Sequence, residues 1–154
     1  MTKALYLDMD GTIADLYNEA DWLTKIRNEV PNLFRNLKPL YELNRLHNLF
    51  NLLMDDGWNI EVITWTPMGA TEDYHNLVAT EKAEWIAEHL PMITKVHALK
   101  YGEAKQKAIT KRAMLEVLAD DNTEVRKVWE TPKRRKTIDA DGDLLEEIAN
   151  FLGR

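Results

Sequence analysis

Two pairs of acidic residues, far apart in the sequence, each follow a short apolar segment. Asp8 and Asp10 come directly after KALYL, and Asp120 and Asp121 come after MLEVLA. In an extended segment residues i and i+2 point the same way, and Gly11 then allows a sharp backbone turn. Carboxylates held close together repel one another unless a cation or a shared proton intervenes. Oxygen ligands without His or Cys suit a hard divalent cation, and with phosphate substrates this cation is usually Mg²⁺.

A hydroxyl group and a lysine would complete a phosphate-binding site beside such carboxylates. Thr64 lies at the end of another apolar segment, NIEVITW, and Lys82, Lys100 and Lys105 lie between Thr64 and Asp120. A carboxylate nucleophile, a second carboxylate for acid–base work, a metal, a hydroxyl and an ammonium are the parts that aspartyl-phosphate formation requires. The residues alone leave open which lysine takes part.

Parallel β-strands would bring these residues together. We expect strands over 3–7, 59–65, 92–99 and 114–119, with 125–129 and 137–138 supplying a last edge strand. We expect helices over 20–30, 41–54, 72–90 and 144–152, and a short helix or turn over 103–110. This alternation favours an α/β sandwich with a mostly parallel sheet. Ligands of such sheets bind beyond the carboxyl ends of the strands, where both acidic pairs and Thr64 are expected.

Composition limits the function further. The chain has 154 residues, which suits a single domain, and its net charge of −6 argues against holding duplex nucleic acid by charge alone. A small phosphorylated substrate needs only a local positive pocket. The absence of Cys excludes a disulfide and a thiolate nucleophile. No apolar stretch is long enough for a membrane span, and the N-terminus becomes acidic by Asp8, so we expect a cytoplasmic protein without a signal peptide.

Three motifs resemble, in the same order, signatures of the haloacid dehalogenase-like (HAD) phosphohydrolases. DMDGT at Asp8–Thr12 resembles the first signature, DxDG[TS]. VITW, which ends at Thr64 and Trp65, resembles the second, and LADDN at Leu118–Asn122 resembles the fourth. KAEWIAEHL, which begins at Lys82, resembles the 5′(3′)-deoxyribonucleotidase subgroup, as does the segment FRNLKPL…LMDDGWNIEVITW. The resemblance implies a HAD-like Rossmannoid three-layer sandwich, formed by a single domain over residues 1–154 with a small helical cap insert around 15–38.

The resemblance also implies a reaction, a phosphomonoester hydrolysis that depends on Mg²⁺. Asp8 would attack phosphorus, and Asp10 would protonate the leaving group and then activate water, with Thr12 orienting Asp10. The implied metal site comprises Asp8, the backbone carbonyl of Asp10, Asp121, and Asp120 either directly or through water. The implied phosphate site comprises Gly11, Thr12, Thr64, Trp65 and Lys82, with Lys82 favoured over Lys100 and Lys105.

The substrate is expected to be small and phosphorylated, most simply a 5′ or 3′ nucleoside monophosphate. Trp85 is expected in the core, Trp22 could cover the leaving group, and Trp65 could either line the cleft or pack inside. One alternative is a 3′-phosphatase acting on polynucleotide ends, because a small cap leaves the site open and Lys133–Lys136 form a basic run. The simpler interpretation of that run is a solvated turn. A second alternative is a non-enzymatic protein that binds a phosphate ligand.

Overall fold

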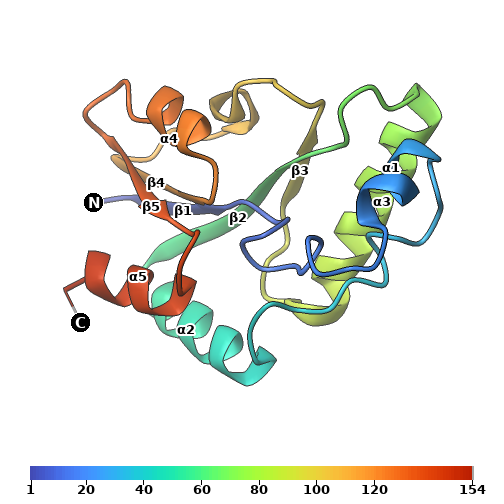
Figure 1. Cartoon of the computed structure of the whole chain (residues 1–154). Helices are drawn as coiled ribbons and strands as arrows, with labels where there is room; N and C mark the ends of the chain where they lie inside the picture. The colour runs from blue at the N-terminus through green and yellow to red at the C-terminus, as the bar shows by residue number, and fades with distance from the viewer. Residues whose placement is uncertain (154) are drawn as a thin grey trace.

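Five parallel strands form one sheet in the computed structural model, which describes residues 1–153. Their order across the sheet is β3-β2-β1-β4-β5, and all four neighbouring pairs are parallel (Figure 1). The strands are β1 (Lys3–Leu7), β2 (Trp58–Trp65), β3 (Val96–Leu99), β4 (Leu115–Asp120) and β5 (Arg135–Asp139). Within residues 1–153, no helix is long and apolar enough to cross a membrane.

Helices cover both faces of this sheet, because alternate strand residues are apolar on both sides. On one face Leu5 and Leu7 join a core that includes buried residues of α2 (Leu43–Asp55), α3 (Glu72–His89) and α5 (Leu144–Phe151). On the other face Ala4 and Tyr6 join a smaller core with Ala108 and Trp129, which belong to the 3₁₀ helix η1 (Lys105–Ala108) and to α4 (Thr123–Trp129). The expected three-layer α/β sandwich is therefore confirmed (Figure 1).

The predicted edge strand was wrong in its first part. Residues 125–129 lie in α4, because the side chain of Asn122 accepts hydrogen bonds from the N–H groups of Glu124 and Val125 and so caps a helix there. Trp129 then packs edge-on against Tyr6, with 5.4 Å between ring centroids. The second part of the prediction, 137–138, lies in β5 and is confirmed.

The helix predicted over 20–30 is shorter than expected. Only α1 (Trp22–Arg27) is helical, and Asp21 and Glu29 on either side of it have positive φ angles of 54° and 51°. Left-handed residues cannot continue a right-handed helix, so they limit α1 to six residues. The other predicted helices and strands are present with bounds shifted by a few residues.

The register of the sheet brings the functional segments to one edge. Leu7 lies opposite Val62 on one side and Ala119 on the other. The N–H of Asp8 donates to the carbonyl of Ala119 at 2.9 Å and prolongs that pairing. The residues that follow β1, β2 and β4 therefore leave the sheet side by side, as the sequence predicted.

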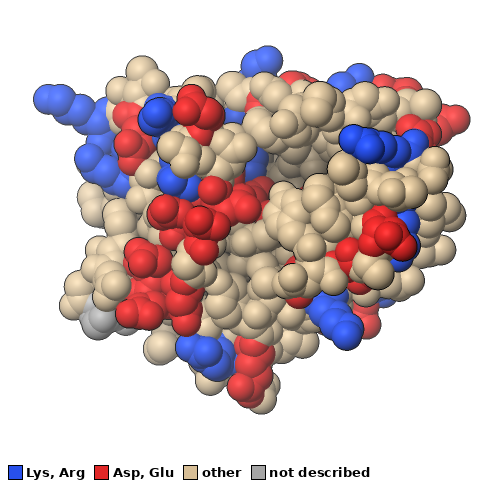
Figure 2. All heavy atoms as spheres, viewed as in Figure 1, with Lys and Arg blue, Asp and Glu red and all other residues tan. Residues whose placement is uncertain are grey.

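Basic side chains are distributed unevenly over the surface. In Figure 2 Lys and Arg side chains gather at the upper left, over α4 and the connection from α4 to β5. Acidic side chains gather below them on the same face.

Candidate active site

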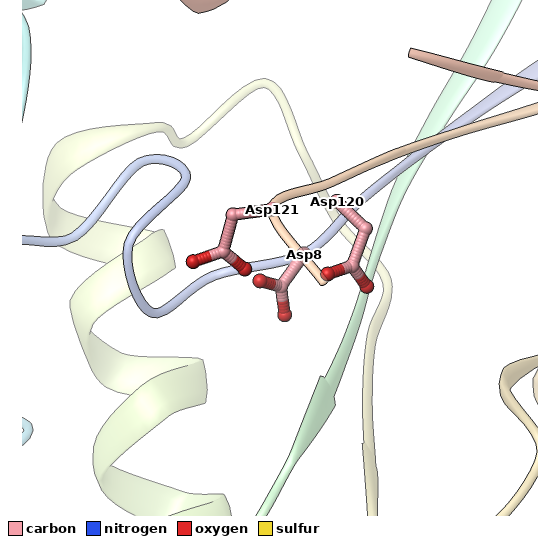
Figure 3. Close-up of side chains that lie close together, drawn as sticks. All are labelled: Asp8, Asp120 and Asp121. Atoms are coloured by element: carbon pink, nitrogen blue, oxygen red, sulfur yellow. The ribbon is translucent and has the colours of Figure 1, made fainter. Parts of the chain in front are cut away.

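Three carboxylates meet where β1 and β4 end. Asp8, Asp120 and Asp121 each offer an oxygen atom within 4.8 Å of the others (Figure 3). Asp8 and Asp120 are buried, whereas Asp121 is partly exposed. Burial, together with the neighbouring carboxylates of Asp8 and Asp120, raises the pKa of the Asp121 carboxyl to about 8. Such crowding of like charges, with oxygen donors alone, fits a hard divalent cation such as Mg²⁺.

Lys105 is the ammonium group that contacts this cluster. Its Nζ lies 2.8 Å from Asp8 Oδ1 and 2.7 Å from Asp120 Oδ2, and the residue is only 3% exposed. The other oxygen of Asp120 accepts the N–H of Asn122 at 2.9 Å. Asp121 has no cationic partner among the residues that the structure describes. Asp121 is therefore the carboxylate best placed to bind a cation directly.

Lys82, the lysine favoured from the sequence, lies beneath the site. It is fully buried, and its Nζ donates to Asp10 Oδ2 at 2.7 Å, to Thr64 Oγ1 at 2.7 Å and to the carbonyl of Trp65 at 2.8 Å. These three acceptors use all three N–H bonds of the ammonium. Lys82 and Thr64 are not among the residues that line the cavity described below, whereas Lys105 is. The third candidate, Lys100, is exposed and pairs with Glu72 on the surface.

Asp10 lies beside the cluster and differs from its members. Its carboxylate contacts Lys82, and its Oδ1 is buried without a hydrogen-bond partner. Burial raises the pKa of Asp10 above its ordinary value, and Lys82 opposes that shift. The expectation that Thr12 orients Asp10 is not met, because the Thr12 hydroxyl donates to Asp8 Oδ2 at 3.2 Å. A carboxyl group that holds its proton readily is suited to protonating a leaving group.

Gly11 is required by the geometry of the turn between the two aspartates. Its φ angle is +77°, in the region that residues with a side chain rarely adopt. A Cβ atom at this position would lie 2.6 Å from Asp121 Oδ2 and 2.6 Å from Cε2 of Tyr17. Glycine therefore allows the carboxylate of Asp121 to approach the backbone after β1.

A cavity of about 590 Å³ lies above the carboxylates and Lys105. Two aromatic pairs line it: Tyr17 with Trp22, whose ring centroids are 5.1 Å apart, and Trp65 with Tyr101, at 4.9 Å. Trp65 also donates its Nε1–H to the carbonyl of Glu103 at 2.8 Å, which holds the ring in place. Trp65 therefore lines the cleft.

A segment that follows Tyr17 and Trp22 in the sequence is hydrogen-bonded to α3. Both oxygens of the buried Glu81 accept backbone N–H groups, from Asn32 at 2.9 Å and from Arg35 at 3.1 Å. Trp85, buried in the core as expected, donates its Nε1–H to the carbonyl of Leu37 at 2.8 Å. These bonds hold residues 32–37, of which Phe34 lines the cavity, against α3.

Sequence reasoning missed Tyr17 and Tyr101 as residues of the site. Tyr17 comes seven residues after Asp10, and Tyr101 follows the weakly marked strand β3. Neither belongs to a motif. The only feature of the sequence that could have identified them is that each is an aromatic residue soon after a strand end or an acidic turn.

Comparisons with known proteins give a likeness of fold. No protein-family model matches the sequence, and no curated protein matches it significantly. Among solved structures, the chain is similar to the D,D-heptose 1,7-bisphosphate phosphatase from Burkholderia thailandensis. The TM-score is 0.55 at 13% sequence identity, and the match covers 99% of this chain and 100% of that chain. The two chains therefore share a fold over their whole length.

Proposed function

We propose that this protein is a Mg²⁺-dependent phosphomonoesterase that works through an aspartyl phosphate on Asp8. The observation that carries the proposal is the arrangement of Lys105 between Asp8 and Asp120, with Asp121 beside them, at the floor of a cavity. The fold shared with a heptose bisphosphate phosphatase supports the same reaction class.

In the first step Asp8 attacks the phosphorus atom of the substrate. Thr12 and Lys105 hold its two oxygens, so the carboxylate is oriented before the substrate arrives. A bond forms between Asp8 and phosphorus while the bond to the leaving oxygen breaks. Asp10 gives its proton to that oxygen and becomes a carboxylate, which the Lys82 ammonium stabilises.

In the second step water hydrolyses the aspartyl phosphate. Asp10 takes a proton from the attacking water, the Asp8–phosphorus bond breaks, and inorganic phosphate leaves with both carboxyl groups restored. General acid–base help of this kind typically contributes about 10²–10⁴-fold to the rate. Lys82 acts through Asp10 and Thr64, whereas Lys105 faces the cavity and can neutralise charge on the phosphate oxygens.

Asp8 and Asp121 would hold the Mg²⁺ ion, with Asp120 contributing directly or through water. When bound, the ion would offset the negative charge that the phosphate brings to three crowded carboxylates.

The proposed substrate is a nucleotide. A phosphate above Asp8 would place the rest of the substrate beside the aromatic residues of the cavity, and stacking on such rings suits a nucleobase. Residues 15–38, which supply Tyr17 and Trp22, would act as a small cap. Because α3 holds the C-terminal part of this cap, we propose that the cap shapes the cavity without opening as a lid.

The test is a phosphate-release assay over nucleoside monophosphates, sugar phosphates and phosphorylated oligonucleotides, with and without Mg²⁺. We expect Mg²⁺-dependent release from nucleotides, and we expect Asp8→Asn to abolish it while leaving the thermal unfolding curve cooperative. Asp55→Asn is the matched control, since Asp55 belongs to an exposed acidic pair at the end of α2. Full turnover by Asp8→Asn would refute the nucleophile, and release without added or bound Mg²⁺ would refute the metal requirement.

A further inference from the structure

One stretch of the chain has the opposite charge balance from the remainder. Residues 104–136 contain ten Lys and Arg and five Asp and Glu, whereas the rest of the sequence contains ten and 21. Three of the five acidic residues in the stretch are Glu116, which is buried, and Asp120 and Asp121 of the site. The exposed part of this stretch is therefore strongly positive on a protein whose net charge is −6.

The basic run noted in the sequence contributes only part of this charge. Arg134 and Arg135 each donate to Glu116 Oε1, at 3.0 and 3.2 Å, so a buried carboxylate already neutralises much of their charge. Arg135 lies opposite Glu116 and pairs with it on the α4 side of the sheet. Successive residues of a strand point to opposite faces, so Lys136 lies on the α5 side. The run is therefore not simply a solvated turn, and by itself it offers too few free cations to bind a polynucleotide.

The available cations are Lys133 of this run and three residues outside it. Lys107, Lys111, Arg112 and Lys133 are exposed, and none makes an ion pair within residues 1–153. Arg112 and Arg134 line one hollow of about 410 Å³. We define the basic surface as Lys107, Lys111, Arg112, Lys133 and Arg134.

The basic surface begins close to the proposed active site and extends to the opposite edge of the sheet, where β4 and β5 begin. It begins two residues after Lys105, because η1 carries both Lys105 at the cavity floor and Lys107 at the surface. α4 packs against η1 and supplies Val125 to the cavity wall. None of the five residues lines the cavity, and the hollow beside Arg112 lies roughly 20 Å from it, which is the length of β4 at about 3.3 Å per residue. A strand of phosphates would leave the cavity past η1 and run beside the 109–114 connection to reach that hollow.

We propose that the basic surface binds the backbone of a single-stranded polynucleotide whose terminal phosphate lies in the active site. This inference rests on the proposed phosphomonoesterase function and names its substrate as the end of a strand. An unpaired end fits the aromatic lining, which needs a free base face, whereas the acidic remainder of the protein repels a second strand.

Salt dependence measures the number of phosphates that the surface contacts. For a single strand the logarithm of the binding constant falls with the logarithm of salt concentration with a slope of about −0.7 per contact. Four to five contacts give a slope of about −3, so raising the salt concentration from 50 to 200 mM weakens binding by about 60-fold. A mononucleotide, which does not reach the surface, would show a much smaller change.

The first test compares two triple variants of equal charge change. In Lys107→Gln/Lys111→Gln/Arg112→Gln the basic surface loses three exposed cations, and in Arg45→Gln/Lys95→Gln/Lys100→Gln three exposed cations are lost elsewhere. Fluorescence anisotropy with a phosphorylated single-stranded 12-mer should show at least tenfold weaker binding and a salt slope flatter by about 2 for the first variant only. Turnover of a mononucleotide should be the same in both variants.

Equal effects of the two triple variants on oligonucleotide binding would overturn the inference. Equal affinity for the single strand, its duplex and polyglutamate would also overturn it. If the wild-type protein releases phosphate from no substrate, the proposed function fails. The binding measurements still decide about the basic surface in that case, because they need no turnover.

Discussion

The variant Lys105→Gln tests whether Lys105, rather than Lys82, is the lysine that acts on the phosphate of the substrate. Lys105 is 3% exposed and is the ammonium partner of both Asp8 and Asp120. Removing one partner of a buried ion pair costs about 3–5 kcal/mol, because the remaining charge stays buried without compensation. At about 2–4 °C per kcal/mol for a chain of this size, the Mg²⁺-free variant should unfold at a temperature lower by roughly 6–20 °C.

Lys105→Gln should also lower kcat. Lys105 is the lysine that faces the cavity, and loss of a single group that stabilises transition-state charge typically costs about 10²–10³-fold in kcat. The assay is phosphate release at saturating Mg²⁺ and a temperature well below the unfolding of the variant, with circular dichroism to show that it is folded.

Lys100→Gln is the matched control for this experiment. Its ion pair with Glu72 is 2.9 Å long, but both side chains are more than half exposed, and such surface pairs contribute about 0–1 kcal/mol. We expect unfolding and kcat of this variant to stay close to those of the wild type. A folded Lys105→Gln protein with a kcat within threefold of the control would refute the assignment of Lys105.

Two further predictions concern the carboxylate cluster. Gly11→Ala should destabilise the protein by about 1–2 kcal/mol, because the φ angle of Gly11 is positive. The new Cβ would displace the carboxylate of Asp121, so the variant should also bind Mg²⁺ more weakly in a calorimetric titration. An unchanged Mg²⁺ affinity would contradict the geometry at Gly11. In Mg²⁺-free protein the pKa of Asp121 is about 8, well above its value of about 4 in an unfolded chain. The folded state therefore binds more protons than the unfolded state between these values, and the contribution of Asp121 to stability should fall as the pH rises from about 4 to 8. Thermal unfolding in EDTA across this range should be flatter with pH for Asp121→Asn than for the wild type, and identical pH profiles would count against the raised pKa.

The place of the site in the fold could be predicted from the sequence. Apolar segments that end abruptly at DMDGT, at Thr64 and at Asp120 identify buried parallel strands, and the carboxyl ends of such strands share one edge. The same reasoning predicted that Asp8 and Asp121 approach one another across 113 residues of sequence, and the structure brings their carboxylates together.

The prediction failed where local patterns were ambiguous. Val125–Trp129 is rich in apolar residues, as an edge strand would be, and only the capping side chain of Asn122 and the packing of Trp129 on Tyr6 favour a helix. The 3₁₀ helix around Lys105 falls within the short helix or turn expected over 103–110, but nothing in that segment marked Lys105 as the lysine that contacts Asp8. Its importance could not be inferred from spacing alone.

The sequence by itself determined the class of fold, the edge of the sheet that carries the site, and the carboxylates that gather there. These follow from hydrophobic burial and from the residues that come directly after each strand, which are local properties. The tertiary structure alone decided that Lys105 faces the cavity while Lys82 lies beneath Asp10, and that two tyrosines complete the aromatic lining. The physical reason is that Lys105 and Asp8 are 97 residues apart in the sequence and that a lysine side chain is long and flexible. Only the packing of the segments between them determines which lysine contacts Asp8.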